Sequence, residues 1–470
     1  MLKKILPIGI LIAFISITPV PAFAVGGGGY ENASFSAKQL GLGGAVTATP
    51  DEPAAISYNP AGIADLPGVQ VQGDANFISL MTFRDNHTTT AGKANTTGST
   101  RSSGTITLVP TGYVTINPGK IFQNKLGLGV GFDSPFGLMN KFKSSDPSTH
   151  YTGWNNYLKM YTIKPTIAYK ITDKVSLGGG PMWYRIYDFG GIQGYPNSLI
   201  PPYTAPDGQI RLNTAGNHWG WQMGALIKLT EKHRVGYYFR SPVVVKTSGL
   251  AKVENSAFYG GNGAYETGVH TKVSLPMNMT WAYAYQPTPK THFEADFTWS
   301  HWSTYQRQYF VTDLTKSVAD NNILNVIRAA DKDYRDAYGL QLGVSHKLTQ
   351  KLTLRGGSWF YWTPIPKTSF IPAVADSNHV AISIGAGYDI NKYLTADLCY
   401  YNSFYFRRRI NNNIGESPVL ANSSVDGTYT SYSQAFTASI TMHWDDIFPR
   451  APGSKGKEAE APSIDIKPAA

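Results

Sequence analysis

Hydrophobic and polar residues alternate with a period of two along most of the chain. Between residues 161 and 171 the odd positions carry mainly Ile and Tyr, and the even positions carry mainly Thr and Lys. The odd positions of 273–285 are all apolar, and similar runs span 293–299, 380–390 and 436–444. Because successive side chains of a strand point to opposite faces, each run predicts a strand with one apolar and one polar face. Going along the chain, the pattern predicts about fourteen antiparallel strands.

The predicted connections alternate between short and long. Short turns occupy 171–174, 230–233, 286–290, 348–351 and 390–392. Long polar segments occupy 83–101, 134–156, 188–215, 248–270, 311–335, 364–378 and 406–427. A soluble β-sandwich would show the same alternation along its strands, but it has no reason to separate its loops by length. Short periplasmic turns and long extracellular loops are typical of an outer-membrane barrel. The fold class predicted is therefore all-β, a transmembrane antiparallel barrel.

The two ends of the chain differ from this pattern. Lys3 and Lys4 precede an apolar run from Ile5 to Val20 and the small-residue site Ala22-Phe23-Ala24, which together indicate a secretory signal peptide. The segment before the first strand is rich in Gly and Ala, and the last residues are rich in Pro, Lys and Glu. We therefore expect a signal peptide at 1–24, a hatch folded into the lumen at 25–66, the barrel at 67–444 and a disordered tail at 445–470.

Composition supports the barrel and narrows its partners. Only 15% of the residues are charged, yet Gly (47), Tyr (29) and Trp (10) are abundant, as aromatic girdles and a small-residue lumen require. The mean hydropathy of −0.22 disfavours a helical membrane protein. The single cysteine, Cys399, excludes an internal disulfide. The net charge of +10 accompanies no nucleic-acid motif, so we expect contact with lipopolysaccharide or an anionic substrate, with Arg407, Arg408 and Arg409 as surface residues suited to phosphates.

Catalytic motifs are not evident in the sequence. Gly-x-Ser-x-Gly, His-Glu-x-x-His and Cys-x-x-Cys do not occur, and the ten histidines show no metal-ligand spacing. Ser300 and His301 are adjacent, and adjacent residues of a strand point to opposite faces, so they cannot form a dyad within a regular strand. We expect no enzyme activity, no catalytic residue, no metal and no cofactor.

Several short motifs give the chain a family resemblance. The N-terminal segment contains Tyr58-Asn59-Pro60-Ala61-Gly62. Further matches are Ser134-Pro135-Phe136-Gly137-Leu138, Trp154, Leu275-Pro276, Tyr283-Ala284-Tyr285, Asp296, Trp299-Ser300-His301-Trp302, Tyr338 to Gly343, Leu354 to Gly357 and Pro364-Ile365-Pro366. In this order and spacing they resemble the FadL family of outer-membrane channels for hydrophobic compounds. The resemblance implies a fourteen-stranded barrel with an N-terminal hatch, a ligand groove among the extracellular loops, an inner site and a lateral exit near a kinked third strand.

The resemblance and the strand pattern together suggest site residues for the hatch and for ligand capture. The hatch residues are Asn59, Pro60 and Ala61, with Val25 at the start of the mature chain. An apolar cluster of Phe136, Leu138, Met139 and Phe142 stands in the otherwise polar loop at 134–156 and suits either ligand capture or packing within the loop. Its opposing wall is expected to be Ile323, Leu324 and Ile327 of a short helix over 318–330.

Two further sets concern the barrel wall. Lys164, Arg355, Glu294 and Asp296 point to the lumen by strand parity, where ion pairs within the wall are a more ordinary role than ligand binding. Gly127, Gly129 and Gly131 share one face of the third strand and permit either a lateral opening or close approach of the hatch.

The predicted function is passive uptake of hydrophobic molecules by a monomeric channel in the outer membrane of a Gram-negative bacterium. Long-chain fatty acids are favoured over aromatic hydrocarbons because of the lumenal Lys and Arg residues. A general porin and an outer-membrane acyl hydrolase are the alternatives. Burial of a tail in an apolar groove stabilises the bound state by about 0.8 kcal/mol per CH₂ group, which allows capture from dilute solution.

Overall fold

The structure is a computed structural model that describes most of the chain. The described residues are 30–32, 35–85, 99–104, 106–195, 207–254, 264–313, 324, 329–414 and 424–444. The expected signal peptide at 1–24, Val25 and the expected tail at 445–470 lie outside them, as do Ile323 and Ile327.

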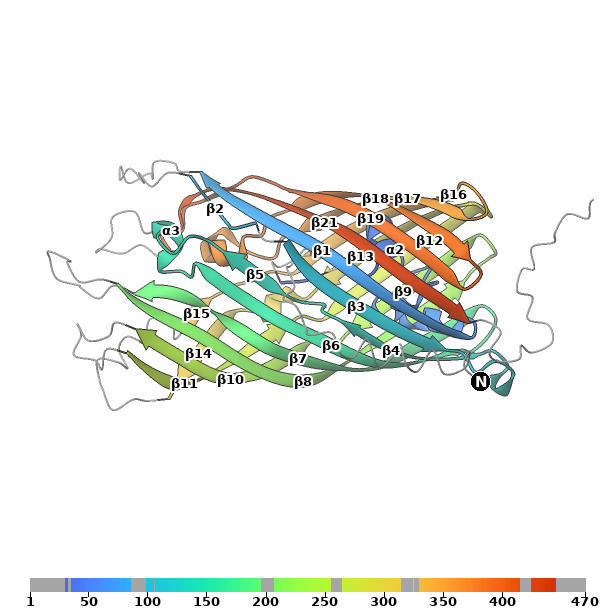
Figure 1. Cartoon of the computed structure of the whole chain (residues 1–470), viewed down its shortest axis with the longest axis horizontal. Coiled ribbons are helices and arrows are strands. Elements are labelled where there is room, and N and C mark those ends of the chain that lie inside the picture. Colours follow the sequence, from blue (N-terminus) through green and yellow to red (C-terminus); the bar gives the residue numbers. More distant parts are fainter. Residues whose placement is uncertain are drawn as a thin grey trace, which may run out of the picture.

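Fourteen strand positions form one closed antiparallel barrel, as the alternation predicted (Figure 1). Closure occurs where the last strand pairs with the first, in an unbroken register from Val69 opposite Trp444 to Asp85 opposite Thr428. In chain order the positions are β1 (Val69–Asp85), β2 (Thr100–Arg101) with β3 (Ile106–Ile116), β4 (Leu126–Asp133) with β5 (Leu138–Lys141), β6 (Asn155–Lys170), β7 (Val175–Tyr195), β8 (Gly208–Lys228), β9 (His233–Arg240) with β10 (Val243–Glu254), β11 (Ala264–Leu275) with β12 (Asn278–Thr288), β13 (Thr291–Ser300) with β14 (Arg307–Thr312), β15 (Ala329–Asp331) with β16 (Ala337–Lys347), β17 (Leu352–Trp362), β18 (His379–Asn391), β19 (Leu394–Tyr405) with β20 (Arg408–Ile410), and β21 (Gly427–Trp444).

Short helices lie inside the barrel and at its ends. They are α2 (Ala37–Gly41), η2 (Pro53–Ser57), η3 (Pro60–Ala64), η4 (Gly119–Phe122), α3 (Pro147–His150), η6 (Trp302–Thr304), η8 (Lys367–Ser369) and η9 (Pro372–Val374). In the described part of the chain, no helix has the length and apolar character needed to cross a membrane.

The barrel is apolar on the outside and largely polar on the inside. In β6 the inward positions include Thr162, Lys164 and Thr166, which are buried, whereas Ile167 and Tyr169 are exposed on the outer face. This is the inverse of a soluble protein, in which large apolar side chains turn inward. An outer surface of this kind requires an apolar surrounding, which a lipid bilayer provides.

The face that points inward changes at several breaks in the strands, and three of these breaks contain a proline. Pro135 lies between β4 and β5, Pro242 between β9 and β10, and Pro276 between β11 and β12. Odd positions point inward in β4, β10 and β11, and even positions point inward in β5, β9 and β12. Proline cannot donate to the ladder and so favours a break at these three points, although pairing continues across Pro110 and Pro165 in other strands.

Because of the last break, the prediction of one continuous face over 273–285 was wrong. Val273 and Leu275 are buried on the inner side of the barrel, whereas Trp281 and Tyr283 are exposed on the outer side. The apolar residues on both sides of Pro276 hid the change of face, because an inward cluster and an outward cluster look alike in sequence.

The predicted extracellular loops were too long, because the strands continue beyond the apolar band. The loop expected over 134–156 is interrupted by β5 and α3, and β6 begins at Asn155. Leu138 and Met139 therefore belong to the barrel wall, paired with β6, and not to a loop. The helix expected over 318–330 is wrong at its end, since Ala329 and Ala330 belong to β15, although Leu324 is helical.

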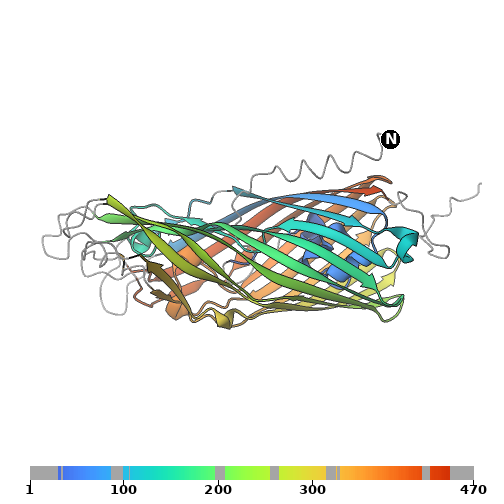
Figure 2. The same cartoon turned by 90° about the horizontal axis from the view of Figure 1, so that it is seen from below.

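An N-terminal inner segment, residues 30–32 and 35–66, lies in the space enclosed by the barrel wall (Figure 2). Its helix α2 contacts β17, β18, β19 and β21, η2 contacts β1, β3 and β4, and η3 contacts β6, β7 and β8. Nearly every described residue from Phe35 to Leu66 is buried. The segment therefore occupies the lumen towards the end of the barrel where the short turns are.

Cysteine labelling can test the change of face at Pro276. In a Cys399→Ser background, Lys272→Cys and Trp281→Cys should react with a maleimide in detergent, whereas Val273→Cys and Ala282→Cys should stay protected by burial. A continuous strand with Trp281 outward would expose position 273 and protect position 272, and that pattern of labelling would contradict the break.

Candidate functional site

Two carboxylates of one strand hold the middle of the inner segment. Asp296 accepts hydrogen bonds from the backbone N–H groups of Val46 and Thr47, at 3.3 and 3.0 Å. Glu294, two residues away on the same inward face of β13, accepts one from the N–H of Ala48 at 2.6 Å. These N–H groups belong to no helix or strand, so the wall satisfies them where they would otherwise be buried without partners.

Asn59 joins the inner segment to the wall at a second point. Its side-chain amide donates to the carbonyl oxygens of Thr47 (2.7 Å) and Ala225 (3.0 Å), the latter in β8. Its Oδ1 atom accepts from the N–H of Ala61, which caps η3 at the position before Pro60. A fixed φ suits proline to the first position of a helix, so Asn-Pro-Ala is a helix start whose cap also binds the barrel.

Glycines in the wall allow the inner segment to lie directly against the strands. A Cβ atom at Gly357 would come within 2.0 Å of the Gly43 nitrogen, and one at Gly178 within 2.6 Å of the Pro60 carbonyl carbon. The third-strand glycines have the same role: Gly127 faces the Ile63 carbonyl, while Gly129 and Gly131 face the side chain of Ile56. At Gly127, Gly178 and Gly357 the backbone of the segment therefore lies directly against the backbone of the wall.

The predicted lumenal charges lie inward, but each has a partner in the protein. Lys164 is almost fully buried and forms an ion pair with Asp133, and its ammonium also donates to Ser57 of the inner segment at 3.0 Å. Arg355 pairs with Asp397 at 2.6 Å. The positive charges of Lys164 and Arg355 are therefore compensated by carboxylates of the wall. The carboxylates of Glu294 and Asp296 accept hydrogen bonds from backbone N–H groups of the inner segment.

Asp65, at the end of the inner segment, adds an ionic contact with the wall. Its carboxylate lies 2.5 Å from Lys170 and 2.7 Å from Lys228. Burial alone would raise the pKa of Asp65, but the two ammonium groups outweigh burial and hold it below its usual value. The carboxylate is therefore ionised at neutral pH.

The first described residues of the chain fill the break in the third strand. The N–H of Asn32 donates to the Pro135 carbonyl at 2.8 Å, and the N–H of Gly137 donates to the Tyr30 carbonyl at 2.7 Å. Glu31 thus lies directly opposite Phe136, as in a short antiparallel ladder. At this break the inner segment completes the hydrogen bonding that β4 and β5 leave open.

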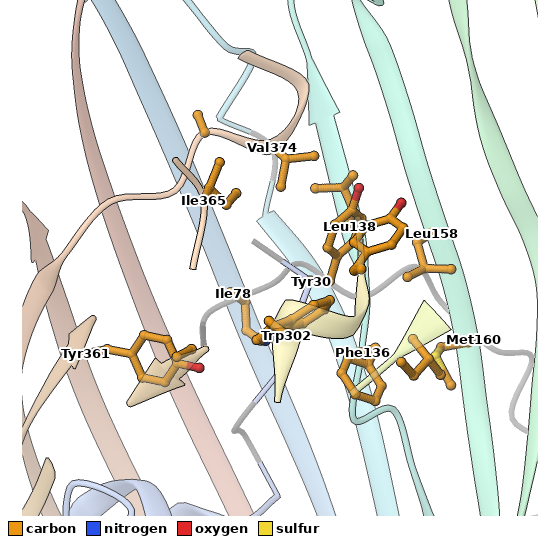
Figure 3. Close-up of a cluster of buried hydrophobic side chains, with 14 of the residues drawn as sticks. Tyr30, Ile78, Phe136, Leu138, Leu158, Met160, Trp302, Tyr361, Ile365 and Val374 are labelled. Carbon is orange, nitrogen blue, oxygen red and sulfur yellow. The ribbon is translucent and has the colours of Figure 1, made fainter. Parts of the chain in front are cut away.

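An aromatic cluster packs around this contact (Figure 3). Tyr30 lies 6.0 Å from Trp302 and 6.4 Å from Tyr305 between ring centroids, and Phe136 meets Trp302 edge-on at 6.3 Å. Tyr334 contacts both Trp302 and Tyr305. Such pairs contribute about 0.5–1.5 kcal/mol each beyond their burial, so the cluster holds Tyr30 against the break.

The carboxylate of Glu31 is bound by groups from four strands. Arg240 forms an ion pair with it at 2.7 Å, and the Tyr361 hydroxyl donates at 3.2 Å. Ser300 donates at 3.3 Å, and Asn278 lies at 3.5 Å. A buried carboxylate is stable only with such a set of donors, and these donors hold the segment across the lumen.

Two cavities lie on either side of Tyr30 and Glu31. The cavity on the side of the inner segment, here called the lower cavity, has a volume of about 120 Å³ and is lined by residues of that segment, such as Glu31 and Tyr58, and by wall residues, such as Arg240, Trp359 and Tyr361. The upper cavity, about 160 Å³, is mostly apolar and is lined by Tyr30, Leu138, Tyr157, Phe189, Leu212, Phe310, Lys332 and Val374, among others. Residues 30 and 31 therefore separate the two spaces.

Lys332, which lines the upper cavity, differs from the paired lumenal charges described above. Its residue is only 7% exposed, and within the described part of the chain its ammonium has neither an ion-pair nor a hydrogen-bond partner. A buried cation without a counter-ion is costly, so a site of this kind favours the arrival of an anionic group. The apolar side chains around Lys332 suit the remainder of an amphiphile.

The structure brings part of the predicted capture set together. Phe136, Leu138 and Phe142 are buried inside the barrel and do not form an exposed groove. Met139, on the outward parity of β5, is partly buried and packs against the same core. Leu324 is buried in a second apolar cluster that includes Leu212 and Val269. Arg408, expected on the surface, is buried and donates to the Asp376 carbonyl at 2.7 Å.

Sequence reasoning missed Tyr30, Glu31, Arg240, Trp302 and Lys332. Most of them stand at or beside a break in a strand, where the parity rule assigns no face. In the sequence, only the prolines at 135, 242 and 276 could have indicated such breaks.

Comparison with known proteins gives one consistent relationship. The family described as "Outer membrane protein transport protein (OMPP1/FadL/TodX)" matches residues 20–444. A long-chain fatty acid transport protein of Escherichia coli O6:H1 is 24% identical over 406 residues, covering 79% of this chain and 85% of its own length. Outer membrane protein P1 of Haemophilus influenzae is 23% identical over 309 residues, covering 59% and 62%.

Solved structures share the fold. The crystal structure of a Pseudomonas aeruginosa FadL homologue has a TM-score of 0.74 at 18% identity and covers 88% of this chain and 99% of that one. The toluene transporter TodX of Pseudomonas putida has a TM-score of 0.62 at 15% identity, with the same coverage.

A pair of adjacent glycines provides a test of the inner segment as a plug. Gly357→Val should displace the segment, because its side chain would overlap Gly43, and should raise the leakage of small solutes from proteoliposomes several-fold. Gly356→Val is the matched control, since a Cβ there meets nothing closer than 3.7 Å. Unchanged permeability in a folded Gly357→Val barrel would contradict a plugging role.

Proposed function

Because this chain belongs to the OMPP1/FadL/TodX family of outer-membrane transport proteins, we propose that it takes up long-chain fatty acids and releases them sideways into the membrane. It is an outer-membrane β-barrel that transports hydrophobic compounds, and its relatives are channels rather than enzymes. The acyl hydrolase alternative is thereby set aside. The choice of substrate and the route are our proposals.

The unpaired ammonium of Lys332 in an apolar cavity is the observation that favours a fatty acid. Volume alone does not discriminate, because a cavity of roughly 150 Å³ accommodates benzene in another protein. A monoaromatic hydrocarbon would leave the charge uncompensated, whereas a carboxylate would form a charge-assisted hydrogen bond with it. The apolar lining would bind the adjoining methylene groups.

The contacts of the inner segment support a lateral route. From Gly43 to Asp65 the segment is bound to the wall by carboxylates, amides, ion pairs and direct backbone packing, so passage towards the short turns is obstructed. At residues 30–32 the segment instead fills an interruption in the wall itself. Withdrawal of these few residues would open the barrel between β4 and β5, beside the bilayer.

Two alternatives remain distinct from this proposal. A general porin needs an open lumen, whereas most of the described inner segment lies inside the lumen of this barrel. A channel for aromatic hydrocarbons is favoured by the likeness to a toluene transporter, but at 15% identity that likeness supports the fold alone.

Substitution of Lys332 tests the substrate. Lys332→Met should weaken the binding of a long-chain fatty acid by about tenfold or more, because a hydrogen bond to a charged group contributes roughly 1.5–3 kcal/mol. Toluene binding should not change. The measurement is isothermal titration of purified protein in detergent, with the exposed Lys347→Met as control. Equal fatty-acid affinity in Lys332→Met and the unaltered protein would refute the headgroup assignment.

A reversible crosslink tests the route. Glu31 and Phe136 are directly opposed, which is a spacing that a disulfide can bridge. In a Cys399→Ser background, the Glu31→Cys/Phe136→Cys protein should stop uptake when oxidised and resume it when reduced, as measured with a fluorescent fatty acid in cells. The two single-cysteine variants control for loss of the Glu31 contacts. Uptake that continues through the fully oxidised form would show that the ligand takes another path.

A further inference from the structure

A row of cations crosses the outer surface of the barrel on one side. Arg185 in β7 stands opposite Asn217 in β8, and Lys246 in β10 stands opposite Lys272 in β11. The pairing of Ala215 with Ser248, continued by two residues, places Asn217 beside Lys246. These four residues, here called the cation row, therefore lie side by side on four adjacent strands.

All four side chains point away from the lumen. The flanking residues Tyr184, Ile186, Val245 and Val273 are buried on the inner side, so the positions between them face outward. Asn217, Lys246 and Lys272 are exposed, and Arg185 is partly exposed. The row ends in an aromatic residue on each side: Tyr161 stands opposite Arg185, and Tyr309 adjoins Lys272 by the register of Thr271 with Phe310.

Aromatic residues place the cation row at a definite height in the membrane. On the periplasmic side of Arg185 and Asn217, the next outward residues are Trp183 and Trp219, which are directly opposed, and Trp219 is 60% exposed. Tryptophan gathers where hydrocarbon meets the polar region of a bilayer. The cations therefore stand at the headgroup level of the extracellular leaflet.

The charges of the row are not compensated by the protein. Like charges directly opposite each other destabilise a sheet, yet Lys246 faces Lys272. Among the described residues, Arg185, Lys246 and Lys272 form no ion pair. The nearest outward carboxylates towards the extracellular end are those of Asp188 and Asp313. Asp188 is bound by Lys159 and Asn213, both at 2.7 Å, and Asp313 lies 3.6 Å from His270.

The opposite side of the barrel is arranged differently. The outward positions at the extracellular ends of β21 and β1 carry Thr428, Thr430 and Tyr432, and Met81 and Phe83. The charges at these ends are Asp85, which pairs with Arg407 at 3.3 Å, and the exposed Arg101 and Arg409, which stand opposite Phe83 and Thr428. There the cations stand opposite uncharged residues or pair with an acidic one, whereas the cation row brings Lys246 directly opposite Lys272.

We propose that the cation row binds the phosphate groups of an anionic glycolipid of the outer leaflet, of the lipopolysaccharide class. Phosphate accepts several charge-assisted hydrogen bonds, and three cations with an amide between them supply donors along a line of adjacent strands. Tyr161 and Tyr309 contact the adjoining sugar and acyl regions. A bound phosphate removes the repulsion between Lys246 and Lys272, so the lipid stabilises this side of the wall. This site is independent of the transport proposal.

Lipid binding to the purified full-length protein tests the assignment. The Arg185→Gln/Lys246→Gln/Lys272→Gln protein should bind lipid A in mixed micelles about tenfold or more weakly than the unaltered protein, because each basic residue near an anionic surface contributes roughly fivefold. Lipid A should also raise the melting temperature of the unaltered protein but not that of the triple variant. Fatty-acid binding should be equal in both, which separates this result from a failure of the transport proposal.

Matched controls make the result specific. Lys290 and Lys347 form a similar pair at the short-turn end, where the N–H of Lys347 donates to the Lys290 carbonyl, so Lys290→Gln/Lys347→Gln should bind lipid A normally. Lys246→Arg/Lys272→Arg should retain binding. Two outcomes overturn the proposal: undiminished lipid A binding by a folded triple variant, or equal affinity of the unaltered protein for micelles with phosphatidylglycerol in place of lipid A.

Discussion

The closed antiparallel ladder, completed where β21 pairs with β1, is the constraint on which the rest of the structure depends. Within a bilayer no water is present to satisfy backbone N–H and C=O groups, so a sheet can cross it only without free edges. Closure fixes the alternation of inward and outward residues around the whole circumference. It also creates a lumen, and the inner segment fills that lumen with groups whose hydrogen bonds the inward polar residues provide.

The same constraint explains why the breaks matter. Where Pro135 interrupts the third strand, the wall loses part of its ladder, and the backbone of residues 30–32 supplies the missing partners. At Ser241 and Pro242 the hydrogen bonding is completed within the wall. The Ser241 N–H donates to the Trp221 carbonyl at 2.9 Å, and the inward side chains of Val243 and Val245 are buried. Only the break in the third strand is completed by a segment that is not part of the wall. It is therefore the one place, among the described breaks, where the wall could change without unpairing a strand from its neighbour.

The sequence predicts the barrel better than it predicts the site. Strand number, the short turns and the outward apolar surface follow from local alternation, because each depends on residues two apart in one strand. The change of face at Pro276 could not be predicted, since Val273 and Trp281 are both apolar although one faces the lumen and the other the lipid. Lys164 and Glu294 were placed inward correctly because they lie in regular strands. Glu31 and Lys332 were missed because neither lies in a regular strand, so their partners, or lack of partners, depend on contacts between distant segments.

The contrast between Lys332 and the other inward charges shows how such a barrel can remain closed and still bind a ligand. Lys164, Arg355 and Arg240 are neutralised by Asp133, Asp397 and Glu31, and their desolvation is offset within the protein. They lie where the inner segment meets the wall, and a ligand that displaced them would have to leave a buried charge unpaired. Lys332 lies beyond Tyr30, in the upper cavity, and has no partner to lose among the residues that the structure describes. Charges that are paired within the fold hold the inner segment in place, and the charge that is left unpaired is the one that can recognise something from outside.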